Sequence, residues 1–258
     1  MTKPHLAILC FAMSACVIAA QTHAEPPAID DTDSVSDIVD TLVNRHGGKD
    51  ATNRWKCGTL NFTTSEGVPP PGLGSVTVTE SFDFPSFFKR SIIAESPEGK
   101  VDLTFIINRD GGWMTSPGKP TIEIPRSFAD RDRHTFADIS AVAHLRDKIE
   151  HVTVVKKLDI DGRPAIQLRL ESKDLGRADF FVDLQSGLLL GTSKQAQYPV
   201  SGQQATISTR LGEYKDIEGI PVPMAFSATS NGRKLLEVAI TGVKFEDSLP
   251  DSTFAKPE

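Results

Sequence analysis

The stretch SVTVTESFDF, residues 75–84, decides the fold of this chain. Val76, Val78, Phe82 and Phe84 alternate in it with small or polar residues. Successive side chains of a strand point to opposite faces of a sheet, so this alternation predicts a strand with one dry face and one solvated face. Such strands are typical of antiparallel sheets, and the dry face needs a cover.

The same period of two recurs along most of the chain from Cys57 onward. Short turn sequences separate the repeats, among them Asp110-Gly111-Gly112, Asp161-Gly162 and Gln185-Ser186-Gly187. Strands spaced this closely indicate antiparallel hairpins. We expect about ten or eleven of them, the first over residues 58–64 and the last over residues 235–245.

Two segments replace this rhythm with the 3.6-residue period of an amphipathic helix. The first begins at Ser34, which can cap it together with Asp37, and ends at Gly47-Gly48. The second spans residues 135–149. The predicted fold is α+β and mainly β, a strongly curved antiparallel sheet wrapped around two helices. The apolar faces of the helices comprise Val35, Ile38, Val39, Leu42 and Val43 in the first, and Phe136, Ile139, Val142, Ala143 and Leu145 in the second.

The start of the chain has the layout of a secretory signal peptide over residues 1–24. Lys3 precedes an apolar run that is too short for a comfortable membrane span, and Ala24 offers a small residue at the cut. We expect a flexible acidic leader over residues 25–33 and a single domain over residues 34–258. The expected location is the periplasm, reached by secretion.

Cysteine usage leaves one thiol in the secreted chain. Cys10 and Cys16 lie in the signal, so Cys57 has no partner for an internal disulfide, and we interpret it as a small buried hydrophobe. The segment Met13-Ser14-Ala15-Cys16 resembles a bacterial lipobox. An alternative location is therefore a membrane surface, with the chain lipid-anchored through Cys16.

The charge of the secreted chain restricts its partners. Without Lys3 it has 27 basic and 34 acidic residues, a net charge near −7. A nucleic-acid partner would require a basic stripe, so we expect none. No second apolar run is long enough to cross a bilayer, and we expect no transmembrane span and a monomer.

The sequence contains few groups arranged for catalysis. His46, His134, His144 and His151 stand apart, and none has the spacing of metal ligands. There is no nucleophile elbow, phosphate-binding loop or dinucleotide motif. The run over residues 159–162, DIDG, has a faint likeness to a calcium loop, and we interpret it as a hairpin turn. We expect no cofactor, no metal and no catalytic residue.

Apolar side chains are in surplus for a sheet that two helices must cover. A curved sheet can leave space unfilled between its dry face and those helices, and aromatic residues of the early strands would then line a cavity for an apolar ligand. Ordinary core packing is the alternative for each of these residues. The expected wall comprises Val78, Phe82, Phe84, Phe88, Arg90, Phe105, Trp113, Ile139 and Val142.

The order of elements resembles the LolA and LolB family of outer-membrane lipoprotein-sorting proteins. Three stretches carry the resemblance: residues 75–90 with Pro85, residues 106–115 (IINRDGGWMT), and the tail from Gly212 to Pro257, which contains GEYKDIEGIPVPMAF and LPDSTFAKP. The resemblance implies an incomplete antiparallel β-barrel closed by helices, with acyl chains held in its hollow. Family carriers often have a basic residue just before the proline; here Phe84 occupies that position, and the nearest basic candidate is Arg90.

The leading functional hypothesis is a periplasmic carrier-type protein that binds a lipid, an acyl chain or an acylated protein and performs no covalent chemistry. One alternative is an envelope sensory or protein-interaction module similar to the RseB family, with other envelope proteins as partners. A third, an enzyme, requires a polar cluster that converges from separate strands, for instance Arg90, Glu80 and Asp102.

Overall fold

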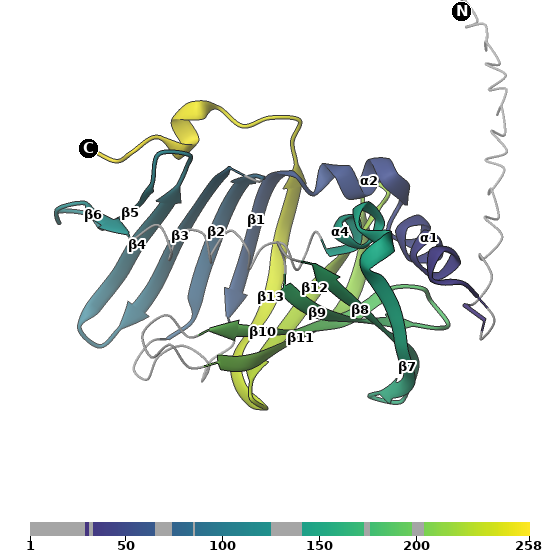
Figure 1. Cartoon of the computed structure of the whole chain (residues 1–258). Helices are drawn as coiled ribbons and strands as arrows, with labels where there is room; N and C mark the ends of the chain where they lie inside the picture. The colour runs from purple at the N-terminus through teal and green to yellow at the C-terminus, as the bar shows by residue number, and fades with distance from the viewer. Residues whose placement is uncertain are drawn as a thin grey trace, which may run out of the picture.

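The computed structural model describes residues 29–30, 33–64, 74–84, 86–124, 141–172, 176–197 and 204–258. These residues form thirteen strands in one sheet, flanked by short helices (Figure 1). The helices are α1 (Val35–Arg45), α2 (Gly48–Arg54) and α4 (Ala141–Asp147), with two 3-10 turns, η1 (Ile149–His151) and η2 (Asp251–Phe254). The strands are β1 (Cys57–Thr64), β2 (Val76–Asp83), β3 (Phe87–Ser96), β4 (Gly99–Ile107), β5 (Gly112–Thr115), β6 (Ile122–Ile124), β7 (Val152–Ile160), β8 (Arg163–Ser172), β9 (Gly176–Asp183), β10 (Leu189–Gln197), β11 (Gln204–Ile217), β12 (Ile220–Ser230) and β13 (Arg233–Phe245).

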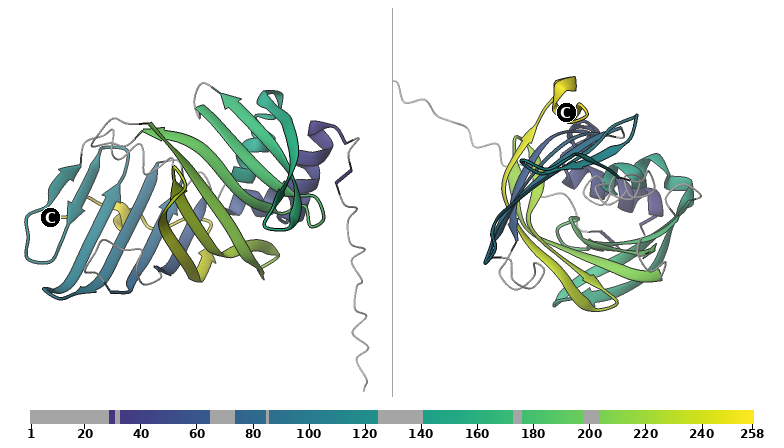
Figure 2. Two further views of the ribbon diagram at one scale, coloured as in Figure 1. Left: turned by 90° about the horizontal axis from the view of Figure 1, so that it is seen from below. Right: turned by 90° about the vertical axis from the view of Figure 1, so that its left-hand side faces the viewer.

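The sheet is antiparallel and open. Its strand order is β6-β5-β4-β3-β2-β1-β13-β12-β11-β10-β9-β8-β7, so the first and last strands of the chain pair at its centre and β6 and β7 form its edges. Figure 2 shows the sheet curving around the helices, which lie on its concave side. The expectation of a curved, incomplete antiparallel barrel covered by helices is confirmed.

The thirteen strands of the structure exceed the ten or eleven that the sequence pattern predicted. One of the additional strands is the edge strand β6, which is three residues long, too short for a period of two to be recognised in its residues. The predicted hairpins are present where the turn chemistry was clear: Asp161 and Gly162 connect β7 and β8 with φ of 54° and 80°, the left-handed region that such turns require. Asp159 belongs to the same turn, because its carboxylate accepts a hydrogen bond from the Gly162 N–H at 2.7 Å.

Helix α1 begins as its sequence predicts. The Ser34 hydroxyl accepts a hydrogen bond from the Asp37 N–H, and the Asp37 carboxylate accepts one from the Ser34 N–H, which completes a capping box. Helix α4 packs against α1, and Arg146 forms an ion pair with Asp40 across the two helices. Leu145 of α4 is fully buried with α1 and the inner face of β7–β10. Both helices therefore cover the inner face of β7–β10.

One described residue of the predicted leader is buried. Ile29 is 6% exposed and packs with the α1 cluster, and its N–H donates a hydrogen bond to the carbonyl of Leu184 at 3.0 Å. Ile29, which lies within the predicted leader, is thus held against the turn that follows β9, and the flexible leader over residues 25–33 stays a prediction. Among the described helices, none is both long and apolar enough to cross a bilayer.

The C-terminal segment covers the face of the sheet opposite to the helices at the β3–β5 end (Figure 2). Phe254 is 3% exposed and packs with Ile106 and Trp113, and its carbonyl accepts a hydrogen bond from the Asn108 side chain at 3.0 Å. The Phe87 ring lies 5.4 Å from that of Phe254. This tail gives the outer face of the sheet a small core of its own.

We expect Phe254→Ala to lower the free energy of unfolding by about 3 kcal/mol, because it removes the ring that fills this outer core. Urea unfolding followed by tryptophan fluorescence checks the value, since Trp113 lies in the same cluster. Ser252→Ala, on an exposed residue of the same turn, is the matched control and should change stability by less than about 0.5 kcal/mol. Equal stability of the two variants would show that the tail contributes nothing to the outer core.

Candidate functional site

The concave face of the sheet is built from cross-strand rows. Residues directly opposite each other on antiparallel strands share a face, so the register fixes each row. Phe82 and Phe88 form one such pair, and they pack with Trp55 at the end of α2, which identifies this face as the one beneath the helices. Moving away from α2 along β2, β3 and β4, the rows are Phe82–Phe88–Ile107, Glu80–Arg90–Phe105, Val78–Ile92–Leu103 and Val76–Ala94–Val101.

An apolar floor occupies the part of this face beyond the Glu80–Arg90 row. Within the described chain, every member of the floor comes from a strand, whereas the two largest clusters both include helical residues. Its buried members are Phe62, Val76, Val78, Ala94, Val238 and Ile240, and its partly buried members are Ile92, Val101, Met224, Phe226, Leu236 and Val243. The helices α1, α2 and α4 contribute no side chain to this cluster, and two of its members, Met224 and Val243, also pack against the neighbouring α2 cluster.

A buried ion pair lies at the boundary between the floor and the cluster covered by α2. The Arg90 Nε donates to the Glu80 Oε1 at 2.6 Å, and the two residues are direct cross-strand partners. The Glu80 side chain is 0% exposed, whereas that of Arg90 is 24% exposed. The guanidinium also lies over the Phe88 ring, 5.1 Å from its centroid. The carboxylate is thus sealed from solvent, whereas its cationic partner keeps a partial exposure.

Burying such a pair is costly unless each charge keeps its partner. Removing one member of a buried pair typically costs about 3–5 kcal/mol, because the other charge then remains desolvated and uncompensated. A pair of this kind gives little net stability compared with apolar residues of the same volume. Its presence on an otherwise apolar face therefore singles out the row of Glu80 and Arg90 as a candidate for recognition.

The expected wall residues divide among several environments. Val78 lies in the floor, and Arg90 and Phe105 share the row beside it. Phe82 and Phe88 are buried in the α2 cluster, where the Phe84 ring stacks on that of Phe82 at 5.1 Å. Val142 packs with α1, away from the floor. Ile139 lies outside the described residues.

The expectation for Trp113 is corrected. Trp113 pairs with Ile106, whose neighbours Phe105 and Ile107 face the concave side, so Trp113 lies on the opposite face under the C-terminal tail. The register of the β4–β5 hairpin decides this, because a shift of one residue exchanges the two faces. Whether the remaining residues line a ligand cavity stays a prediction.

The enzyme hypothesis relied on Arg90, Glu80 and Asp102, and the structure does not bring the three together. Asp102 pairs with Ile93, on the face opposite to the ion pair. Sequence reasoning also left Glu80 without a role in binding. The signal was available, because Glu80 is the only charged residue at an apolar position of the alternating stretch from Val76 to Phe84.

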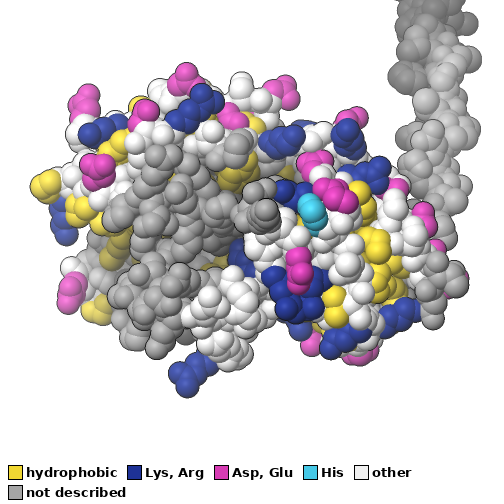
Figure 3. Space-filling view, in the orientation of Figure 1, with side chains coloured by type: hydrophobic (Ala, Val, Ile, Leu, Met, Phe, Trp, Pro, Cys, Tyr) yellow, Lys and Arg dark blue, Asp and Glu magenta, His cyan; other side chains and the backbone are white. Residues whose placement is uncertain are grey.

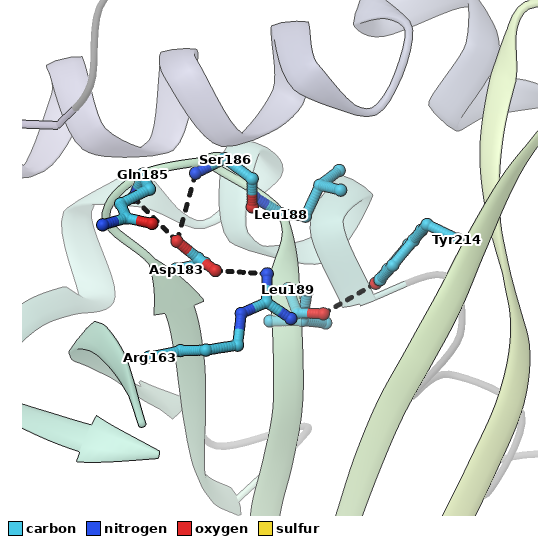
Figure 4. A network of polar contacts seen from close by, with 7 residues as sticks. All are labelled: Arg163, Asp183, Gln185, Ser186, Leu188, Leu189 and Tyr214. Atoms are coloured by element: carbon cyan, nitrogen blue, oxygen red, sulfur yellow. Dashed lines mark hydrogen bonds and ion pairs between the residues drawn. The ribbon is translucent and has the colours of Figure 1, made fainter. Parts of the chain in front are cut away.

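A second polar network lies at the turn between β9 and β10 (Figure 4). The Asp183 carboxylate accepts hydrogen bonds from the N–H groups of Gln185 and Ser186, at 2.7 and 3.1 Å, and forms an ion pair with Arg163. The Tyr214 hydroxyl donates to the Leu189 carbonyl at 2.7 Å. These contacts satisfy a turn and the backbone of a strand, so we interpret the network as structural.

The buried titratable groups near this turn are held in their uncharged forms. His46 is 6% exposed at the end of α1, its Nδ1–H donates to the Leu42 carbonyl at 2.8 Å, and its ring meets Tyr214 edge to face. Burial lowers the pKa of His46 to about 4, opposed by the hydrogen bond to Leu42. Burial also raises the pKa of Tyr214 above its usual range. Neither group is suited to proton transfer near neutral pH.

Cys57 is the one cysteine among the described residues, and it is buried. Burial is the main cause that raises the pKa of Cys57 to about 11, so the thiol stays protonated at neutral pH. Among the described residues, no group of three or more His, Cys, Asp and Glu side chains is placed to hold a metal ion. Among the residues that Figure 3 colours, Lys and Arg are interspersed with Asp and Glu.

Solved structures share this architecture. A LolA superfamily protein from Nitrosomonas europaea superposes with a TM-score of 0.54 at 14% sequence identity, over 84% of this chain and 96% of that protein. The chain has the LolA-like fold. A DUF1329 family protein from Desulfovibrio piger gives a TM-score of 0.54 at 12% identity, over 87% of this chain and 98% of that protein. No protein-family model and no curated protein matches the sequence.

We expect stability to fall between pH 6.5 and pH 4 through His46. The unfolded chain binds a proton near pH 6.5, whereas the folded chain binds it only near pH 4, so acid favours unfolding by about 3 kcal/mol across this window. Urea titrations of the wild type and His46→Gln at several pH values measure the difference in slope. His151→Gln is the control, because that side chain is 50% exposed. A wild-type slope equal to that of His46→Gln would contradict the assignment.

Proposed function

We propose that this chain binds the acyl chains of a lipid or an acylated protein on its apolar floor, as a carrier-type protein of the cell envelope. The observation that carries the proposal is the floor itself, a strand-built apolar cluster to which no described helix contributes. An apolar sheet face is stable only when covered. An acyl chain supplies apolar surface of the required kind along strands that run for eight to ten residues.

The energetics favour a carrier that works without an energy source. Each methylene removed from a bilayer costs about 0.8 kcal/mol, so an acyl chain of about fifteen methylenes costs roughly 12 kcal/mol to extract. Burial against an apolar floor returns most of that free energy, which makes transfer nearly isoenergetic. Binding that is no tighter than the membrane itself allows the cargo to be released.

Location in the periplasm follows from the signal-like start of the sequence and remains part of this proposal. The similarity in fold to a LolA superfamily protein supports the same setting by analogy. We infer that the protein acts by binding and release, without covalent chemistry. Support comes from the groups found nearest to a reactive arrangement, His46, Cys57 and Tyr214, which are buried and uncharged at neutral pH.

We expect Ile92→Gln to weaken the binding of an uncharged fluorescent acyl probe by about tenfold, because the amide would have to be desolvated beneath the acyl chain. Ile93→Gln is the matched control. Ile93 is the next residue of β3, faces the opposite side of the sheet and is 41% exposed, so its substitution should leave the affinity unchanged. Fluorescence titration of both purified variants measures the difference.

Organic extraction of the secreted protein, followed by lipid mass spectrometry, provides the accompanying test. The proposal predicts co-purified acyl lipid in the wild type and less of it in Ile92→Gln. Protein without bound lipid and without affinity for the probe would contradict it. A stoichiometric protein partner recovered with such lipid-free protein would instead support the interaction-module alternative.

A further inference from the structure

Strand β7 forms one edge of the sheet (Figure 1). It runs over nine residues, Val152–Ile160, or about 30 Å, whereas β6 at the other edge has three residues. Within the described chain, its strand partner is β8 alone. An edge strand presents N–H and C=O groups on its outer side, and an extended segment of another protein can add to such an edge as a further strand. The length of β7 makes it the edge suited to strand addition.

Apolar side chains are exposed along this edge. Val154 and Val155 are 42% and 38% exposed, and among the large apolar residues that are exposed in the described chain they are the only two adjacent in sequence. The register with β8 shifts between Val154 and Lys156, which leaves Val155 in a β-bulge without an opposite residue on β8. An added strand would give these two side chains the cross-strand neighbours that no described strand provides on that side.

The charge of the edge restricts which segment can add to it. Lys156 and Lys157 follow the two valines, and both are exposed. Their cross-strand partners on β8, Gln167 and Ile166, are uncharged. With Asp159 the strand has two basic residues and one acidic residue, a net charge of +1, in a chain whose net charge is −6. Acidic side chains opposite the lysines would be attracted, whereas basic ones would be repelled.

A second copy of the chain is a poor partner for this edge. The midpoint of β7 is Lys156, so two copies paired antiparallel over the whole strand would place this lysine opposite its own copy. Like charges directly opposite each other on neighbouring strands are destabilising, and lysines and bulges on an edge strand oppose self-pairing. The same features leave the edge open to a segment of opposite charge.

We propose that β7 is a docking edge for an acidic, extended segment of a partner protein, which adds to the sheet as a further strand. Acidic residues of this segment lie opposite Lys156 and Lys157, and apolar residues lie beside Val154 and Val155. The inference goes beyond acyl binding, because the buried members of the floor belong to β13, β1, β2 and β3 at the centre of the strand order, whereas β7 is at its end. Docking at this edge is therefore compatible with a ligand on the floor.

Two fluorescein-labelled peptides of nine residues test the charge requirement. Both alternate Thr and Val, and two central residues are Glu-Glu in one peptide and Lys-Lys in the other. In fluorescence anisotropy titrations, the wild type should bind the acidic peptide about tenfold more tightly than the basic one. In Lys156→Glu this preference should fall about fivefold, because an attractive cross-strand pair becomes a repulsive one.

Lys215→Glu is the matched control. Lys215 is an exposed lysine of β11, which pairs with β10 on one side and β12 on the other. This variant carries the same change in net charge, so it should keep the wild-type preference. A loss of preference equal to that in Lys156→Glu would show that the peptides respond to overall charge, and it would overturn the inference.

Hydrogen–deuterium exchange identifies the strand that is bound. Saturating acidic peptide should slow amide exchange over residues 152–160, since outward-facing N–H groups of β7 would then donate to the added strand. Exchange over β6 is the internal reference and should not change. Absence of peptide binding, protection confined to other strands, or a wild-type dimer with the β7 amides already protected would overturn the inference. The acyl-probe titration of Ile92→Gln is a separate measurement, so failure here leaves the proposed function standing.

Discussion

Coverage of the dry face of a long curved sheet is the constraint on which this structure depends. The thirteen described strands form one sheet, and the described helices α1, α2 and α4 are short. Helices α1 and α4 pack over β7–β10, and α2 packs over the ends of the central strands. The middle of the sheet, at Val78 and its neighbours, keeps an apolar surface built by strands alone. A ligand that is itself apolar satisfies the same requirement as a helix would.

The Glu80–Arg90 pair shows how this surface is divided. It lies in one cross-strand row, with a helix-covered aromatic row on one side and the apolar floor on the other. The opposite face has a different organisation, in which Phe254 of the tail fills the space over Trp113. The outer core closes that face at the β3–β5 end of the sheet, so the acyl-binding surface that we propose lies on the concave face alone.

Local sequence patterns predicted most of the helices and strands, because the formation of each helix or strand depends mainly on residues that are neighbours in the sequence. The alternation around Val78 gave β2, and Ser34 with Asp37 gave the start of α1. The same patterns could not assign Trp113 to a face of the sheet, because that assignment depends on the register of the β4–β5 hairpin. They also could not predict the burial of Ile29, because a single apolar residue in an acidic segment has no periodicity. Nor could they predict the packing partner of α4, because its apolar face suits any apolar surface. In the structure α4 packs against α1.

The candidate site was predictable only in part for the same reason. Val78 and Phe105 follow from alternation, whereas the role of Glu80 depends on Arg90 of the next strand being directly opposite.

Photolabelling with a diazirine-bearing acyl ester, followed by peptide mass spectrometry, tests the central claim most directly. The account predicts labels on concave residues such as Ile92 and Phe226. Labels confined to the outer face, around Ile93, or no saturable labelling, would contradict it.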